Sequence, residues 1–228
     1  MTVLVVGSRP DSLGSAVRDM LQNKGLSVAT AGISGEMHYL DIVDHNSVSL
    51  IMNRVRPSQV VCTAGINQSF SLRAEGLVSG VESSFYVNAL GPITLLQAWV
   101  HMLETTELGT TQGPKQFVAI SSNSAHIARR NSIAYCASKA ALSMALRCAA
   151  RELAGEGKLV YGYEPGLLAG TPMTAASADA FPGALHRMPG VKPDGLSTRD
   201  FAATIVANLT HPNQALHGTM LRLDAGEQ

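Results

Sequence analysis

The chain has 228 residues, of which 46% are apolar and 15% are charged, so it can bury a sizeable core. Seventeen basic residues balance seventeen acidic ones, which favours neither nucleic acid nor an anionic membrane as a partner. The three cysteines and seven histidines show no metal-ligand or redox spacing. There is also no apolar run of membrane-spanning length and no basic leader. These features predict a cytoplasmic protein of one domain, residues 1–228, without a metal site.

The N-terminal residues resemble the opening of a βαβ unit. The β-branched run Thr2–Val6 ends in Gly7, and apolar residues then recur with helical spacing as far as Leu21. A glycine-containing turn between strand and helix can hold a phosphate through free backbone N–H groups. An ordinary strand-to-helix turn explains this segment equally well, because Asp11 and Ser12 stand where a third glycine would be sought.

Strands and helices continue to alternate along the chain. Further strands are predicted at residues 26–32, 36–42, 58–65, 115–122, 158–166 and 218–226, and helices at 44–56, 81–104, 135–155 and 197–209. This alternation predicts an α/β protein with a three-layer, doubly wound Rossmann-type fold, in which helices cover both faces of a parallel sheet of about seven strands. Ligands of such sheets bind beyond the carboxyl ends of the strands, where Gly7, Asp41 and Gly65 fall. Their convergence favours a nucleotide site.

Local signals mark the ends and interruptions of these helices. Asp44 is suited to cap the helix that ends before Pro57, and Ser197 or Thr198 to cap the last one. Gly91 and Pro92 should kink the long helix at 81–104.

Tyr135 and Lys139 stand four residues apart in a helical segment and therefore share one face of it. A lysine cation there would lower the pKa of a nearby tyrosine hydroxyl. A phenol tuned in this way can exchange a proton with a substrate oxygen near neutral pH. Taken alone, the pair is better explained as an aromatic residue and a charge on an ordinary helix, because such spacings arise often by chance.

The motifs together resemble the short-chain dehydrogenase/reductase family, NAD(P)-dependent oxidoreductases on a Rossmann-type sheet. Ser122 lies 13 residues before Tyr135, at the family's spacing. The matching pieces, in the family's order, are G-S-R-P-D-S-L-G, L-D-I, T-A-G, N-A-L-G-P, I-S-S, Y-C-A-S-K, P-G-L-L-A-G-T-P-M and G-T-M-L-R-L-D-A-G. The resemblance implies an enzyme that acts on a small-molecule carbonyl or alcohol substrate.

The resemblance also implies a role for each matching residue. Tyr135 would be the general acid or base, and Lys139 would lower its pKa and bind the nicotinamide ribose. Ser122 would hold the substrate oxygen, and Asn88 would position a water that links Lys139 to solvent. The predicted cofactor-binding residues are Gly7, Arg9, Ser12, Leu13, Gly14, Asp41, Ile42, Ala64, Gly65, Tyr135, Lys139, Pro165, Gly166 and Thr171.

The sequence also departs from the family's pattern. Its glycine-rich turn is one residue longer and has Ser12 for the middle glycine, the N-N-A-G motif becomes Cys62–Gly65, and Glu164 precedes the Pro-Gly pair. One extra residue separates Gly166 from Thr171. The altered turn and Glu164 motivate an alternative, a non-catalytic dinucleotide-binding sensor or partner-binding protein. Against it, all four catalytic positions carry the expected residues.

The choice of cofactor depends on two side chains. An acid at the end of the second strand would bind the ribose 2′-hydroxyl and select NAD, but that region holds no acid before Glu36. Arg9, inside the turn, can pair with a 2′-phosphate through charge-assisted hydrogen bonds. NADP(H) is therefore predicted over NAD(H). The competing interpretation is that Arg9 is a solvated surface residue and that Glu36 reaches back.

Residues 167–196 form the predicted substrate lid. Its apolar members suit a hydrophobic or acyl-type carbonyl, although a lid that buries its own side chains explains them equally well; they are Leu167, Leu168, Met173, Phe181, Leu185 and Met188. Family analogy predicts a homodimer or homotetramer that packs through the helices around Asn88 and Tyr135, with the C-terminal strand as a further candidate.

Overall fold

The computed structural model describes residues 1–105, 113–175 and 196–223. Most of the predicted lid, with Phe181, Leu185 and Met188, therefore lies outside the described residues, as do the last residues of the predicted C-terminal strand.

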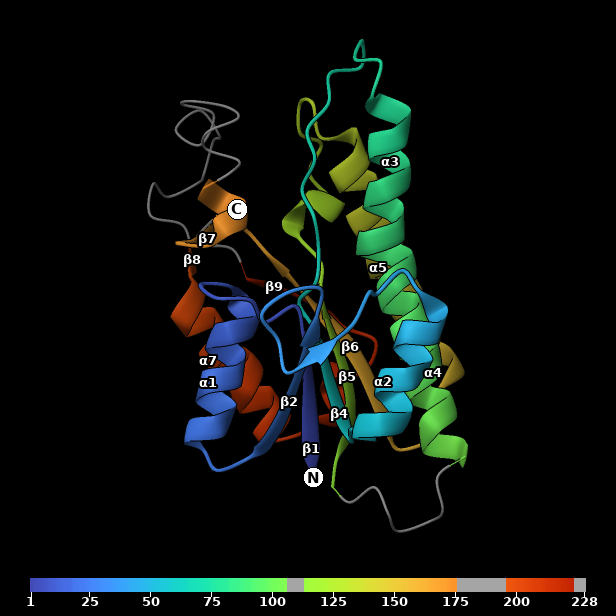
Figure 1. Ribbon diagram of the computed structural model, residues 1–228, viewed down its shortest axis with the longest axis vertical. Helices are drawn as coiled ribbons and strands as arrows, with labels where there is room; N and C mark the ends of the chain where they lie inside the picture. Colours follow the sequence, from blue (N-terminus) through green and yellow to red (C-terminus); the bar gives the residue numbers. More distant parts are fainter. Residues whose placement is uncertain (106–112, 176–195, 224–228) are drawn as a thin grey trace.

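The described residues form a parallel sheet of seven strands in the order β3-β2-β1-β4-β5-β6-β9 (Figure 1). The strands are β1 (Thr2–Val6), β2 (Ser27–Gly32), β3 (His38–Tyr39), β4 (Gln59–Cys62), β5 (Lys115–Ile120), β6 (Lys158–Pro165) and β9 (Met220–Leu223). A separate two-stranded sheet joins β7 (Leu168–Ala169) and β8 (Leu196–Ser197). The predicted doubly wound Rossmann-type fold is confirmed.

Helices cover both faces of the seven-stranded sheet (Figure 1). On one face α1 (Leu13–Asn23) packs against α7 (Thr198–Thr210), and on the other lie α2 (His45–Val55), α4 (Gly91–Thr105) and α5 (Ile133–Glu152). Helix α3 (Leu77–Phe85) packs against α5. Short helical turns are η1 (Tyr86–Leu90), η2 (Asn123–Ala125) and η4 (Gln214–Leu216). Among the described helices, none has both the length and the apolar character needed to cross a membrane.

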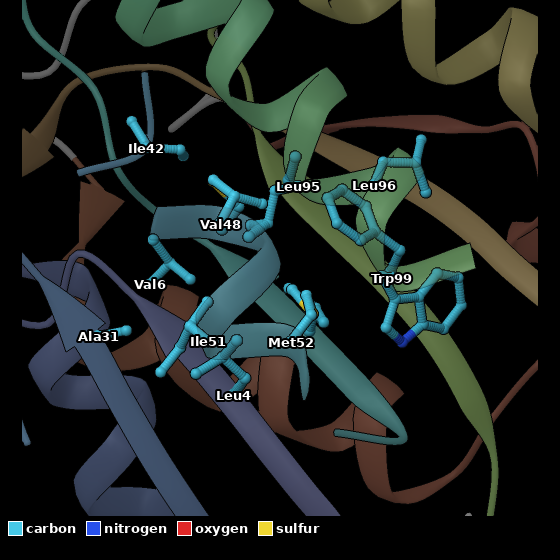
Figure 2. Close-up of a cluster of buried hydrophobic side chains, with 14 of the residues drawn as sticks. Leu4, Val6, Ala31, Ile42, Val48, Ile51, Met52, Leu95, Leu96 and Trp99 are labelled. Carbon is cyan, nitrogen blue, oxygen red and sulfur yellow. The ribbon is translucent and has the colours of Figure 1, made fainter. Parts of the chain in front are cut away.

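The central strands are mainly apolar because helices bury both of their faces. Val3 and Val5 of β1 point towards α1 and α7, whereas Leu4 and Val6 point towards α2 and α4. Figure 2 shows the second of these clusters, in which side chains of β1 meet those of α2 and α4, including Trp99. The indole Nε1 of Trp99 donates to the carbonyl of Pro57 at 3.2 Å, so the buried polar group has a partner.

Two predicted helix caps are confirmed. The side chain of Asp44 accepts a hydrogen bond from the N–H of Asn46 at 2.9 Å, at the start of α2. The side chain of Ser197 likewise accepts a hydrogen bond from the N–H of Asp200 at 3.3 Å, at the start of α7. Both are short-range contacts between neighbouring residues, so the sequence contains the information that determines them.

The prediction of a long helix at 81–104 was wrong in two respects. The helical segment begins earlier, at Leu77, and it is interrupted by a π-helical turn at Tyr86–Leu90, which ends directly before Gly91 and Pro92. A π-helical turn inserts one extra residue, which changes the direction of the side chains that follow it. The third strand is also shorter than predicted, because only His38 and Tyr39 pair with β2.

Candidate active site

The predicted site residues gather where the parallel strands end. Gly7 follows β1, Asp41 and Ile42 follow β3, Ala64 and Gly65 follow β4, Ser122 follows β5, and Pro165 and Gly166 stand at the end of β6. Tyr135 and Lys139 lie on α5, and Asn88 lies on η1.

Ser122, Tyr135 and Lys139 form one cluster. The hydroxyl of Ser122 hydrogen-bonds the hydroxyl of Tyr135 and also accepts the N–H of Ser124 at 3.1 Å. The Nζ atom of Lys139 lies 5.8 Å from the centre of the Tyr135 ring. Three residues that the sequence separates by up to 17 positions thus meet at the end of β5.

Lys139 is 3% exposed, and its Nζ donates to the carbonyl of Ile120 at 2.8 Å. Burial disfavours the charged form and lowers the pKa of Lys139 to about 8. The neighbouring Cys62 opposes this shift, but burial also raises the pKa of the Cys62 thiol, to about 11. Lys139 therefore titrates close to neutral pH in the protein without cofactor.

The pKa of Tyr135 departs from the sequence-based expectation. Burial raises the pKa of its hydroxyl, and the hydrogen bond from Ser122 and the charge of Arg129 oppose that shift only in part. The expected lowering by Lys139 is not met in this structure, because loss of hydration disfavours the phenolate more than the neighbouring groups favour it. Without cofactor, Tyr135 is a protonated phenol that can donate a proton.

Asn88 is fully buried, and backbone and side-chain groups hold its amide in place. Its Oδ1 accepts the N–H of Ile66 at 2.8 Å, and its Nδ2 donates to the carbonyl of Ile66 at 2.9 Å and to Ser138 at 3.0 Å. A Cβ atom on Gly65 would lie 3.2 Å from Asn88 Oδ1 and 3.4 Å from Lys139 Nζ. Both side chains therefore flank Gly65, while the predicted water-binding role of Asn88 stays a prediction.

The lengthened turn folds without disturbing the start of α1. Asp11 takes a left-handed backbone conformation with φ 58°, and the Ser12 hydroxyl donates to the carbonyl of Arg9 at 2.7 Å. The same oxygen accepts the N–H of Ser15 at 3.2 Å as the helix cap. The first N–H groups of a helix have no partner within it, so those of Leu13 and Gly14 remain for a ligand.

Close packing beneath this turn explains why residue 14 is a glycine. A Cβ atom there would lie 2.5 Å from the carbonyl oxygen of Gly7, 2.7 Å from Thr63 Oγ1 and 2.9 Å from the Cα of Ser8. Thr63 Oγ1 itself lies 2.9 Å from the carbonyl oxygens of both Val6 and Gly7. Thr63, which departs from the family's N-N-A-G motif, therefore links the end of β4 to the turn.

Ser8 is a further candidate site residue that was not singled out from the sequence. It follows Gly7, is fully buried, and its hydroxyl has no hydrogen-bond partner within the described ranges. An unpartnered buried hydroxyl beside two free helix N–H groups fits a phosphate-containing ligand. The signal was present in the sequence, but a serine beside a glycine is too common to be informative by itself.

The residues predicted around the two ends of the cofactor have mainly local partners. Asp41 Oδ1 accepts the N–H of Val43 at 3.1 Å, and Thr171 Oγ1 contacts Thr174 Oγ1 at 3.0 Å. Arg9 is exposed. Glu36 folds back over Gly32 at the end of β2, where a Cβ atom would overlap its carboxylate, and accepts the N–H of Ser34 at 3.1 Å.

Arg129 and Asn123 border the cluster and were not predicted from the sequence. Arg129 donates to Asn123 Oδ1 and to Ser124 Oγ, both at 3.0 Å. These bonds hold η2, the short helical turn that follows Ser122. Glu164 lies fully buried on the α5 side of β6, where its partners are His126, Ser143 and Arg222.

The family model for the short chain dehydrogenase matches residues 1–180. The chain belongs to the short-chain dehydrogenase family. This dehydrogenase is therefore an oxidoreductase that acts on CH–OH or C=O groups. No curated protein matches its sequence.

Solved structures share the fold at low sequence identity. Ligand-free aldohexose dehydrogenase of Thermoplasma acidophilum is 20% identical, with a TM-score of 0.83 over 99% of this chain and 92% of the other. The 3-oxoacyl-[acyl-carrier protein] reductase of Brucella melitensis, in complex with NAD, is 19% identical, with a TM-score of 0.81 over 98% and 95%. ElxO with NADP bound is 22% identical, with a TM-score of 0.80 over 98% and 96%. These neighbours include structures with either dinucleotide.

Proposed function

We propose that this dehydrogenase transfers hydride between a nicotinamide cofactor and a carbonyl or alcohol substrate, with Tyr135 as the general acid or base. The hydrogen bond between Ser122 and Tyr135, with Lys139 beside the ring, carries this proposal. The cofactor, when bound, supplies or accepts the hydride. The free N–H groups at the start of α1 and the hydroxyl of Ser8 fit the phosphate groups of such a cofactor.

The residues of the cluster have complementary roles in this proposal. Ser122 orients the substrate oxygen within reach of the Tyr135 hydroxyl. In the reducing direction Tyr135 donates its proton to that oxygen, and burial keeps the phenol protonated until then. The Lys139 cation, below its pKa of about 8, stabilises the phenolate that remains. Asn88, which flanks Gly65 with Lys139, is the proposed partner for the water that returns the proton.

Replacing Tyr135 by Phe tests this role, because it removes the proton donor and little volume. Turnover of a panel of aldehydes and ketones should fall by about 10²-fold or more, with the cofactor dissociation constant unchanged within about twofold. Tyr39→Phe, at an exposed tyrosine of β3, is the matched control. Unchanged turnover in Y135F would refute the role of Tyr135. Cofactor binding without turnover of any carbonyl would instead favour a non-catalytic dinucleotide-binding protein.

NADP(H) remains the proposed cofactor on the strength of Arg9, an exposed guanidinium in the phosphate turn. NAD(H) is a second candidate, which the position of Glu36 supports. A carboxylate over Gly32 accepts hydrogen bonds from a ribose 2′-hydroxyl and repels a 2′-phosphate.

Calorimetric titration of NADPH and NADH into the wild type, Arg9→Gln and Glu36→Gln distinguishes the two cofactors. If NADP(H) is the cofactor, R9Q weakens NADPH binding by about tenfold and leaves NADH binding unchanged. Tighter NADH binding by the wild type, lost in E36Q, would replace the assignment by NAD(H).

We further propose that the protein forms a homodimer or homotetramer. Exposed apolar side chains on α3, η1, α4 and α5 support this assembly; they are Val78, Tyr86, Leu90, Ile93, Ile133 and Met144. Sedimentation equilibrium of the full chain measures the assembly, and a monomer at micromolar concentration would contradict it. Among the apolar residues of the predicted lid, Leu168 packs against the core. This contact favours the explanation that the lid partly buries its own side chains.

A further inference from the structure

Glu164 is a buried carboxylate that the proposed chemistry does not use. It stands on β6 directly before Pro165 and Gly166, and it is 0% exposed. The register of β6 turns Glu164 to the side that faces α5, away from the face buried by Tyr161 and Tyr163. An unpaired carboxylate in such surroundings would be strongly destabilising, so its partners must offset the loss of hydration.

Those partners come from three other elements. His126, just after η2, places Nε2 2.9 Å from both carboxylate oxygens, and Ser143 of α5 donates to Oε1 at 2.8 Å. Arg222 of β9 donates through Nε to Oε2 at 3.4 Å, and a guanidinium nitrogen of Arg147 lies 4.0 Å from Oε1. The side chains of His126, Arg147 and Arg222 are 31%, 36% and 58% exposed, so only the carboxylate is fully removed from water.

A chain of hydroxyl groups leads from Glu164 towards the catalytic cluster. Ser143 uses its only hydroxyl hydrogen on Glu164, so it can only accept from Ser121, whose oxygen lies 2.8 Å away. The Ser121 hydroxyl can also donate to the carbonyl oxygen of Lys139 at 3.0 Å. Ser121 is the neighbour of Ser122 in the chain, and Lys139 is one helical turn from Ser143. The carboxylate therefore fixes Ser143 as a donor where β5 meets α5, and Ser121 must donate its single hydrogen to Ser143 or to the Lys139 carbonyl.

Glu164 thus has two arms, which are its hydrogen bonds to Ser143 of α5 and to His126. The second of these acts on η2. His126 ends the short turn that begins at Ser122, so its bond to the carboxylate anchors the far end of that turn. Ser122 accepts the N–H of Ser124 within the turn, and the same serine bonds Tyr135. A displacement of η2 would therefore alter the position of Ser122 relative to the phenol.

We propose that Glu164 is a positioning residue for the hydride-transfer site, holding η2 through His126 and α5 through Ser143. This inference rests on the proposed function, because it assumes that the Ser122–Tyr135 pair performs the chemistry. Glu164 contacts neither of these side chains in the described structure and acts only through the two arms. This proposal also gives a role to the acid before the Pro-Gly pair, which departs from the family's sequence pattern.

Glu164→Gln is the main test, because it keeps the volume and replaces one accepting oxygen by an NH2 group that faces donors. Turnover should fall by about 10- to 100-fold with the cofactor dissociation constant within about twofold, since small displacements of catalytic groups have effects of this size. Glu156→Gln, at an exposed carboxylate paired with Lys158, is the matched control. Wild-type turnover in folded E164Q would overturn the proposal.

Two smaller changes separate the arms and avoid a folding failure. Ser143→Ala and His126→Gln should each lower turnover in the wild-type background and have little further effect in the E164Q background, because they act through the same carboxylate. Fully additive effects would overturn the proposal. A loss confined to thermal stability in all three variants would do the same, because it would leave only a structural role.

Amide hydrogen exchange provides a measurement that needs neither cofactor nor substrate. In E164Q and H126Q the amides of residues 123–126 should lose protection relative to E156Q, while those of α1 stay unchanged. Unchanged protection would overturn the η2 arm. The two proposals can fail separately: if Y135F loses turnover and E164Q does not, the positioning role fails and the proposed function stands, whereas active Y135F refutes the function itself.

Discussion

The two ends of the proposed cofactor site are held in different ways. Around Tyr135, two buried polar side chains are fixed by partners from distant parts of the chain: Lys139 by Ile120, and Asn88 by Ile66 and Ser138. At the phosphate turn, Thr63 bonds Gly7, but the start of α1 is held locally, since Ser12 contacts Arg9 and Ser15, three residues away on either side. The proposed catalytic end is therefore organised by the tertiary fold, and the start of α1 by a helix cap.

Burial explains this difference. Lys139 and Asn88 are almost fully removed from water, and buried polar groups without partners are costly, so the surrounding elements must supply them. The N–H groups at the start of α1 can instead bind solvent until a ligand arrives. A local turn of this kind tolerates one extra residue, which the positive φ of Asp11 accommodates. The catalytic end has no comparable freedom.

The largest expected effect concerns the charge buried at the catalytic end. The pKa of Lys139 falls from 10.5 to about 8 on folding, so between these values the unfolded chain binds more protons than the folded one, and stability rises with pH. Relative to Lys139→Met, the wild type should gain up to about 3 kcal/mol of unfolding free energy across this interval. Below pH 8 the difference should stay constant.

Urea denaturation of both proteins without cofactor at a series of pH values measures this gain. Lys24→Met, at an exposed lysine near the end of α1, controls for the loss of a positive charge. A difference between wild type and K139M that does not change with pH would show that Lys139 is hydrated in the folded protein.

A smaller effect is expected from filling the space beneath the turn. Gly14→Ala puts a methyl group against the carbonyl oxygen of Gly7 and Thr63 Oγ1, so α1 must move away. We expect a loss of about 2 kcal/mol in unfolding free energy and a weaker cofactor affinity. Gly76→Ala is the control, because its nearest neighbour would be Phe70 at 3.4 Å. Equal stability of the two variants in urea would contradict the close packing described for the turn.

The smallest expected effect is a change in cofactor affinity, and a comparison of two buried serines reveals it. Ser8 and Ser84 are both fully buried, and the hydroxyl of each is unpartnered within the described part of the chain, but only Ser8 adjoins the turn. Ser8→Ala should weaken cofactor binding by about 1 kcal/mol, the value of one hydrogen bond, whereas Ser84→Ala should not. Calorimetric titration of NADPH and NADH provides the comparison. Equal affinities in both variants would exclude the Ser8 hydroxyl from the site.

Much of this molecule could be predicted from short sequence patterns. The alternation of apolar strands with amphipathic helices predicted the doubly wound sheet, and Asp44 and Ser197 marked two helix starts correctly. The spacing of Ser122, Tyr135 and Lys139 predicted a cluster that the fold does assemble. The π-helical turn around Asn88 had no such pattern, because it packs against α5, which lies far along the chain.

What the sequence determined by itself, then, was the order of the elements and the kinds of chemical group at the strand ends, since both follow from spacing between nearby residues. Only the tertiary structure decided how those groups behave. Burial raises the pKa of Tyr135 and lowers that of Lys139, and both shifts depend on neighbours contributed by other elements. Glu164 was an unexplained acid in the sequence, and it acquired partners because β6 lies between β5 and β9 and beneath α5. The physical reason is that hydration and electrostatic interactions depend on distances in space, which a linear pattern does not contain.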